Sequence, residues 1–218
     1  KYLFLFTSVL LISCADDDKY EDINRDPNNP TEVSADALFT SATKSLFDQM
    51  ESTNVNTNVF RLFAQYWTET TYVDESNYDL VTRNIAANHW TEMYTNVLYD
   101  LKDAKSLVES DNKKAMIEVL EVYTWQQLVD TYGDIPYSAA LLGAEDPTPA
   151  YDDDMAIYRD LVVELDEAVA LIDNASSSAL NPGGNDVMLN GDMETWKKFV
   201  LLILNLELNK RKPNRLFT

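Results

Sequence analysis

Few residues in this 218-residue chain belong to the types that carry out nucleophilic or metal chemistry. The chain contains one cysteine, Cys14, and one histidine, His89. A Ser-His-Asp or Cys-His site would have to use His89, which lies beside Trp90 at an expected helix start and is better interpreted as a packing residue. A zinc site would need carboxylates for most of its ligands, which is uncommon. The composition therefore predicts no catalytic residue, no metal site and no cofactor.

Carboxylates are the abundant reactive groups, with 37 acidic against 17 basic residues and a net charge of −20. This charge repels nucleic acids and anionic lipid surfaces, so we expect no nucleic-acid partner. Two carboxylates flanking a sugar could support glycoside hydrolysis, so a hydrolase stays open as an alternative. The acidic runs 16–18 and 152–154 are better explained as part of a solvated tether and as a helix N-terminus.

Cys14 follows a segment that is typical of a secretory signal. Residues 1–13 begin with a basic residue, and the apolar run that follows ends at Ile12. A membrane span needs roughly 20 apolar residues, so this run is too short. The sequence Leu-Ile-Ser before Cys14 resembles a bacterial lipobox, in which the thiol accepts a diacylglyceryl group. We expect a signal peptide over 1–13, without its start, and a lipidated acidic tether over 14–33; a signal followed by a chance cysteine is the alternative.

Aromatic residues are the best candidates for ligand contacts. The chain has 12 Tyr and 4 Trp, whose rings combine a flat apolar face with a polar group. Flat rings of this kind stack on the faces of sugars. Most of them fall on helical stripes and are expected in the core, among them Trp90, Tyr94, Tyr123 and Trp196. The candidates for ligand binding lie at a helix end and in a polar segment, where they could instead anchor a loop: Trp67, Tyr72 and Tyr78.

Hydrophobic periodicity predicts that helices position these rings. The first expected helix starts near Ser34, a residue type that caps helix N-termini. The fourth expected helix is apolar on two sides, which indicates a helix sandwiched between neighbours. The helices after the first, of which 113–132 is the fourth, are expected in these segments: 55–68, 90–108, 113–132, 153–173 and 193–209.

The connection after the fourth helix is expected to be ordered. Gly133 supplies a positive-φ end to that helix, and Pro136 prevents the helix from resuming. The connection 134–151 is too long and too aromatic to be a plain linker. The run 152–154 then provides three carboxylates suited to a helix N-terminus.

Paired antiparallel helices suggest an all-α fold with tetratricopeptide-like helix pairs, an α-solenoid. The expected pairs are the third helix with the fourth and the fifth with the sixth. The usual tetratricopeptide consensus is not visible, so periodicity by itself gives only an all-α chain of layered helix pairs.

Several segments together resemble the SusD/RagB family, and within it the SusD-like branch. Their order and spacing carry the resemblance more than any single segment does. The segments are INRDPNNPTEVSADALFTSA (23–42), DTYGDIPY (130–137), P-x-Y-D (149–152), IYRDLVVELDEA (157–168) and GDMETWKKF (191–199). The resemblance implies tetratricopeptide-like helix pairs over 34–218 and a lipid anchor at Cys14.

The same resemblance implies a function without catalysis. Members of the family are outer-membrane lipoproteins on the surface of Gram-negative bacteria that bind glycans or other nutrients. They act as a lid on a SusC-like TonB-dependent transporter. Family members are usually more than twice this long, so we expect an N-terminal piece of a longer protein, with a truncated or frameshifted tail over 200–218. The alternative function is a helical-repeat lipoprotein that scaffolds protein or peptide partners.

Overall fold

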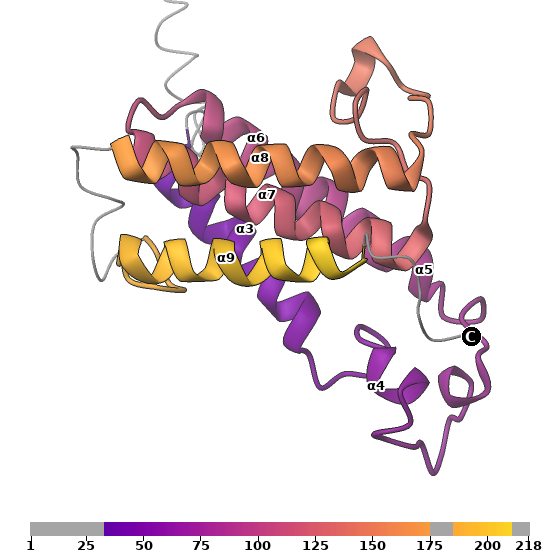
Figure 1. Ribbon diagram of the computed structural model, residues 1–218. Helices are drawn as coiled ribbons and strands as arrows, with labels where there is room; N and C mark the ends of the chain where they lie inside the picture. Colours follow the sequence, from indigo (N-terminus) through magenta and orange to yellow (C-terminus); the bar gives the residue numbers. More distant parts are fainter. Residues whose placement is uncertain (1–32, 175–184, 211–218) are drawn as a thin grey trace, which may run out of the picture. The chain divides into compact units, whose positions relative to one another are not determined.

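The computed structural model of the chain describes residues 33–174 and 185–210 (Figure 1). The chain divides into two units, Lys1–Val33 and Ser34–Thr218, and the helices described below belong to the second. The expected signal peptide, Cys14 and all of the tether except Val33 lie outside the described residues. Regular structure in the described ranges is helical apart from one isolated β-bridge, which confirms the all-α prediction.

The helices keep the order that periodicity predicted, with one exception. The elements are α3 (Ala35–Glu51), α4 (Phe60–Phe63), η1 (Glu75–Asn77), α5 (Ile85–Thr91), η2 (Glu92–Leu98), α6 (Tyr99–Ser106), α7 (Asp111–Tyr132), η3 (Gly143–Glu145), α8 (Asp154–Asn174) and α9 (Met193–Lys210). Here η1 and η3 are 3₁₀ turns, and η2 is a π-helical segment. None of the helices within the described ranges combines the length and apolar character that crossing a bilayer requires.

The N-terminal cap of α3 is the one expected from the sequence. The Ser34 hydroxyl oxygen accepts a hydrogen bond from the Ala37 backbone N–H at 3.2 Å. Phe39, Ala42 and Leu46 then point into the core at helical spacing and are fully buried.

The helix predicted over 55–68 is wrong, because only Phe60–Phe63 is helical there. Asparagine side chains bond to nearby backbone before the helix: Asn54 Oδ1 accepts from the Asn56 N–H at 3.0 Å, and Asn58 Oδ1 accepts from the Phe60 N–H at 3.2 Å. Such local bonds give the backbone an alternative to helix. Beyond the helix, Gln65 adopts a φ of 58°, which prevents further helical turns.

The third predicted helix is a continuous run of α5, η2 and α6. Its buried stripe falls within the predicted range 90–108 and includes Met93, Val97, Leu98 and Leu101. The π-helical segment inside this run is an i→i+5 irregularity of a kind that often occurs at functional sites.

The central helix of the core is α7, as its two apolar sides predicted. It contacts α3, α6, α8 and α9, and α8 and α9 run alongside it in Figure 1. Met116, Leu120 and Leu128 are fully buried on it. Burial of each such side chain contributes about 1.5–3 kcal/mol to folding, so α7 is the main stabilising element.

The most extensive contacts between helices do not fall within the predicted pairs. The expected pairs do contact each other, yet the most extensive contacts join α3 to η2 and α6, and α7 to α8. The shift follows from the missing helix at 55–68, since α3 then packs on the next long helical run. The arrangement remains a layered, tetratricopeptide-like set of helix pairs.

The connection from α7 to α8 is held by its own acidic residues. Gly133 ends α7 with a φ of 75°, as expected. Asp152 Oδ2 accepts from the Tyr137 N–H at 2.9 Å and the Ser138 N–H at 2.8 Å, and the Asp152 N–H donates to Ile135 O at 2.8 Å. These bonds return the chain beside the end of α7 and make α8 antiparallel to it.

Only one of the three predicted capping carboxylates caps α8. Asp153 Oδ1 accepts from the Ala156 N–H at 2.9 Å, which is an N-cap bond. The first residue of the helix, Asp154, instead donates its N–H to Asp134 Oδ1 at 3.0 Å. The run 152–154 therefore serves both the helix start and the preceding loop.

Candidate functional site

The segment between α4 and α5 changes direction repeatedly through left-handed backbone. Gln65, Tyr72, Tyr78 and Asn84 have φ values of 58°, 57°, 63° and 52°. Positive φ is uncommon for residues other than glycine and is costly for bulky ones. Such residues cluster at ligand-binding and active sites, so this segment is a candidate ligand-binding site.

Three aromatic side chains surround a hollow on this segment. The hollow has a volume of about 370 Å³ and is lined by Leu62, Gln65, Tyr66, Trp67, Thr68, Ser76 and Tyr78. The exposed fractions of Tyr66, Trp67 and Tyr78 are 82%, 41% and 64%. We call these three residues the aromatic platform.

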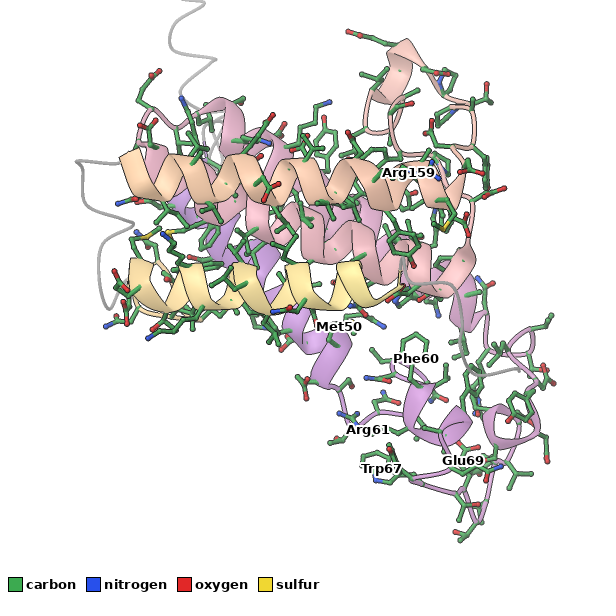
Figure 2. All side chains as sticks on the ribbon, viewed as in Figure 1. Met50, Phe60, Arg61, Trp67, Glu69 and Arg159 are labelled. Carbon is green, nitrogen blue, oxygen red and sulfur yellow. The ribbon has the colours of Figure 1, made fainter. Side chains whose placement is uncertain are left out.

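Two of the three platform rings, those of Tyr78 and Trp67, contact a neighbouring side chain. The ring of Tyr78 stacks on that of Phe63, with centroids 5.1 Å apart and planes at 23°. The guanidinium carbon of Arg61 lies 5.1 Å from the centre of the Trp67 ring, a cation–π contact. Figure 2 shows Arg61, Trp67 and Glu69 together on the segment that starts at α4. The rings of Trp67 and Tyr78 are thus each held against a neighbouring side chain without a ligand.

Polar bonds close the loop that carries Tyr78. Glu69 Oε2 accepts from the Ser76 N–H and hydroxyl, both at 3.0 Å, and the Ser76 hydroxyl oxygen accepts from the Glu69 N–H at 3.2 Å. Arg83 pairs with the fully buried Glu75 and lies 3.3 Å from the Asp74 carboxylate. Hydrogen bonding to Glu75 raises the pKa of Arg83, so the guanidinium that closes this loop stays charged.

The structure brings together two of the three ligand-binding candidates. Trp67 and Tyr78 line the same hollow, whereas Tyr72 does not. Tyr72 is 81% exposed, and its ring centre lies 6.0 Å from the Arg83 guanidinium carbon. Tyr66 is a member of the platform that sequence reasoning missed, because it was assigned to the helix expected over 55–68. The adjacent pair Tyr66-Trp67 was the available signal.

The rings expected in the core fulfil that expectation. Trp196 is fully buried, and Trp90, Tyr94 and Tyr123 are half-buried against the core. His89 is buried as well and accords with a packing role, since its exposed fraction is 6%. Burial lowers the pKa of His89, so the imidazole is neutral near pH 7.

The platform offers stacking surfaces and neutral hydrogen-bonding groups. Gln65, Thr68 and Ser76 add amide and hydroxyl groups beside the rings. Among the residues that line this hollow, all of them within the described ranges, none carries a carboxylate or an imidazole. The hollow can therefore hold the flat face of a sugar but lacks an acid–base pair for its hydrolysis.

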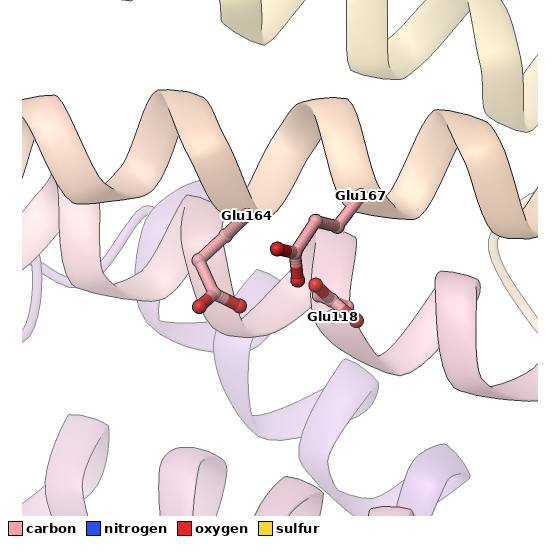
Figure 3. A group of neighbouring side chains, drawn as sticks. All are labelled: Glu118, Glu164 and Glu167. Carbon is pink, nitrogen blue, oxygen red and sulfur yellow. The ribbon is translucent and has the colours of Figure 1, made fainter.

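Carboxylates gather elsewhere, between α7 and α8. Oxygens of Glu118, Glu164 and Glu167 lie within 4.8 Å of one another (Figure 3). The Lys105 ammonium lies 3.7 Å from Glu118 and 2.9 Å from Glu121. Burial, which outweighs Lys105, raises the pKa of Glu118 to about 7. Carboxylate oxygens alone would suit a hard cation, but the Lys105 ammonium and the raised pKa of Glu118 account for the approach of these groups.

A second acidic group belongs to the connection before α8. Asp134, Asp153 and Asp154 bring carboxylate oxygens within 4.8 Å of one another. The oxygens of Asp134 and Asp153 accept backbone hydrogen bonds there. Their arrangement is explained by helix capping and loop closure.

Comparison with known proteins adds to this geometry. The SusD-like family model, described as "Starch-binding associating with outer membrane", matches residues 27–218. No curated protein matches the chain.

Solved structures share the fold. A chitin-binding protein is 25% identical, with a TM-score of 0.63, and the match covers 78% of this chain and 37% of that one. A SusD/RagB family protein from Bacteroides thetaiotaomicron is 21% identical, with a TM-score of 0.65 and coverage of 84% and 40%. A chitin-binding SusD homologue from Flavobacterium johnsoniae is 23% identical, with a TM-score of 0.56 and coverage of 74% and 36%. This chain thus spans well under half the length of each relative.

Proposed function

We propose that this chain, which belongs to the SusD-like family of starch-binding proteins associated with the outer membrane, binds a glycan on the aromatic platform and catalyses no reaction on it. The observation that carries the proposal is the hollow between Tyr66, Trp67 and Tyr78. Its rings are exposed and flanked by neutral polar groups, and two of them, those of Trp67 and Tyr78, are held by neighbouring side chains, which is the chemistry that a sugar face requires.

The chitin-binding protein that is 25% identical to this chain supports a polysaccharide ligand. The absence of ionisable catalytic groups from the described lining of the hollow supports binding without hydrolysis. The two groups of three carboxylates that lie within 4.8 Å of one another among the described residues are in the helical core and in a loop closure, so neither supports the hydrolase alternative.

The proposed site predicts which substitutions weaken glycan binding. Trp67→Ala or Tyr78→Ala should lower the affinity for a bound oligosaccharide about tenfold or more, because each removes a stacking surface worth roughly 1.5–3 kcal/mol. Tyr72→Ala is the matched control, since Tyr72 is an exposed tyrosine of the same segment outside the hollow.

Isothermal titration of the whole protein with starch and chitin oligosaccharides measures these affinities. Two outcomes would show that the platform is not the binding site. One is an equal loss of affinity in the Tyr72 and Trp67 variants, and the other is an unchanged affinity in both the Trp67 and the Tyr78 variants.

We further propose that the bound glycan is delivered to a SusC-like TonB-dependent transporter and that Cys14 anchors the protein to the outer membrane by lipid. The family description supports the membrane association, and the lipobox-like sequence supports the anchor. Cys14→Ala should shift the protein from the detergent phase to the aqueous phase in a partitioning assay. Unchanged partitioning would contradict the anchor.

The partner is tested by affinity purification of the whole lipidated protein from solubilised outer membranes. A co-purifying TonB-dependent barrel, identified by mass spectrometry, would support uptake. Recovery of other protein partners without a barrel would favour the alternative of a helical-repeat scaffold, which predicts no sugar binding.

A further inference from the structure

The connection between α7 and α8 stands out from the ends of these helices (Figure 1). We call residues 134–155, which comprise this connection and the first two residues of α8, the acidic loop. Bonds to the preceding helices hold it: the Tyr94 hydroxyl donates to Pro136 O at 2.7 Å, and the Lys102 ammonium donates to Leu141 O. Pro147 and Pro149 restrict the backbone of its outer part. The acidic loop is therefore ordered in advance, which lowers the entropic cost of binding a partner.

Three large apolar side chains of the acidic loop face solvent. The exposed fractions of Leu142, Tyr151 and Met155 are 42%, 66% and 38%. The ring of Tyr151 stacks on that of Trp90, with centroids 6.4 Å apart and planes at 27°, and Trp90 stacks in turn on Tyr94 at 4.6 Å. Exposed aromatic side chains that are supported in this way are typical anchors of protein–protein interfaces.

The charge of the acidic loop has a single sign. Its sequence contains no lysine, arginine or histidine, and the next basic residue is Arg159. It contains six acidic residues: Asp134, Glu145, Asp146, Asp152, Asp153 and Asp154. Protein interfaces pair potentials of opposite sign, so the surface that complements this loop is basic.

We infer that the acidic loop docks on a basic segment of a partner protein, and, because the inference rests on the proposed function, that this partner is the transporter. Tyr151 is the apolar anchor of the contact, and the carboxylates beside it pair with lysine and arginine side chains of the partner. A second copy of this chain, with its net charge of −20, is repelled, and so is an anionic lipid surface.

The test quantifies the TonB-dependent barrel that co-purifies with the whole lipidated protein from solubilised outer membranes. Glu145→Lys combined with Ala150→Lys places two positive charges at exposed positions of the acidic loop. Recovery of the barrel should fall at least about tenfold, because like charges then face each other across the interface. Glu109→Lys is the matched control: it reverses the charge of an exposed residue outside the loop and should leave the recovery unchanged.

Two measurements on the interface itself complete the test. Raising the NaCl concentration from about 0.05 M to about 0.5 M should lower recovery of the barrel by the parent protein several-fold, because salt screens exposed charges. Replacement of Tyr151 by the photoreactive p-benzoylphenylalanine should give a cross-link to the barrel, and mass spectrometry should locate it in a peptide that carries lysine or arginine.

Two results would overturn the inference. They are unchanged recovery of the barrel by the double variant, and a cross-link from position 151 only to a second copy of this chain or to lipid. In either case, a barrel that co-purifies with the parent would leave the proposed function standing, whereas a parent that recovers no barrel would contradict the proposed delivery as well. Glycan titration of the double variant should match the parent, since neither substituted residue lines the hollow of the platform. If the double variant binds no glycan, it is misfolded, and the cross-link from position 151 decides.

Discussion

The indole N–H of Trp196 donates to Asp186 Oδ2 at 2.8 Å, and both side chains are buried. The same carboxylate accepts from the Gly191 N–H at 2.7 Å through Oδ2, and from the N–H groups of Met188 and Leu189, both at 3.0 Å, through Oδ1. A buried carboxylate is tolerated when donors satisfy it in this way. Asp186 therefore ties the loop 185–192 to the first turn of α9.

Replacement of Asp186 by Ala should destabilise the protein by about 3 kcal/mol, because four N–H donors lose their acceptor inside the core. Urea unfolding followed by circular dichroism measures the change. Asp192→Ala is the control: Asp192 is an exposed N-cap of α9 that accepts from the Thr195 N–H at 3.3 Å, and its loss should destabilise the protein clearly less than the loss of Asp186. Equal effects would contradict a central role for Asp186.

The carboxylates between α7 and α8 predict a fall in stability as the pH rises. The groups that face one another are Lys105 on α6, Glu118 and Glu121 on α7, and Glu164 and Glu167 on α8. The pKa of Glu118 is raised by burial from 4.5 to about 7. The folded protein holds the Glu118 proton more tightly than the unfolded chain, so stability decreases between about pH 4.5 and pH 7.

Glu118→Gln should flatten this pH dependence and make the protein about 2 kcal/mol more stable than the parent at pH 8, because the buried charge is gone. Urea unfolding at pH 5, 6, 7 and 8 tests this expectation. Glu109→Gln is the control, since Glu109 is exposed. A parent protein that becomes more stable with rising pH across this window would show that Glu118 is not protonated in the fold.

We expect the Glu75–Arg83 ion pair to keep the loop beside the platform ordered. Arg83→Met leaves the side chain of fully buried Glu75 without its ion-pair partner, so the loop that the pair closes should open more readily. We expect faster amide hydrogen exchange in segment 69–84, with little change in α7. Lys44→Met removes an exposed pair with Asp48 and should change stability by less than about 0.5 kcal/mol. Unchanged exchange in 69–84 would contradict the role of Arg83.

We expect replacement of Gly133 to destabilise the protein through backbone strain alone. An added Cβ at Gly133 would meet nothing within 4 Å, yet the φ of 75° with a ψ of −125° is accessible mainly to glycine. Gly133→Ala should therefore destabilise the protein by about 2 kcal/mol, as measured by thermal unfolding. Gly143→Ala, also in open space but with a φ of 59°, should cost less because it is a residue of a surface turn. If Gly143→Ala costs as much stability as Gly133→Ala or more, the backbone at the end of α7 relaxes to accept the added Cβ.

Much of the helical framework could be predicted from the sequence because its signals are local. The Ser34 cap, the buried stripe through Met93 and Leu101, and the end of α7 at Gly133 depend on residues within a few turns of each other. The apolar character of α7 on both sides likewise predicted a helix between neighbours. Family membership followed from the order of short segments.

The tertiary structure decided the pairing of the helices and the composition of the site. Trp67 and Tyr78 meet at one hollow, Tyr66 joins them, and Tyr72 stays apart, because left-handed residues turn the backbone and contacts such as that of Phe63 with Tyr78 join separate parts of the segment. The contact between His89 Nδ1 and the Tyr132 hydroxyl joins residues more than 40 positions apart in the chain. Residue type and helical periodicity determine which side chains are available; contacts between distant segments determine where their rings and lone pairs point.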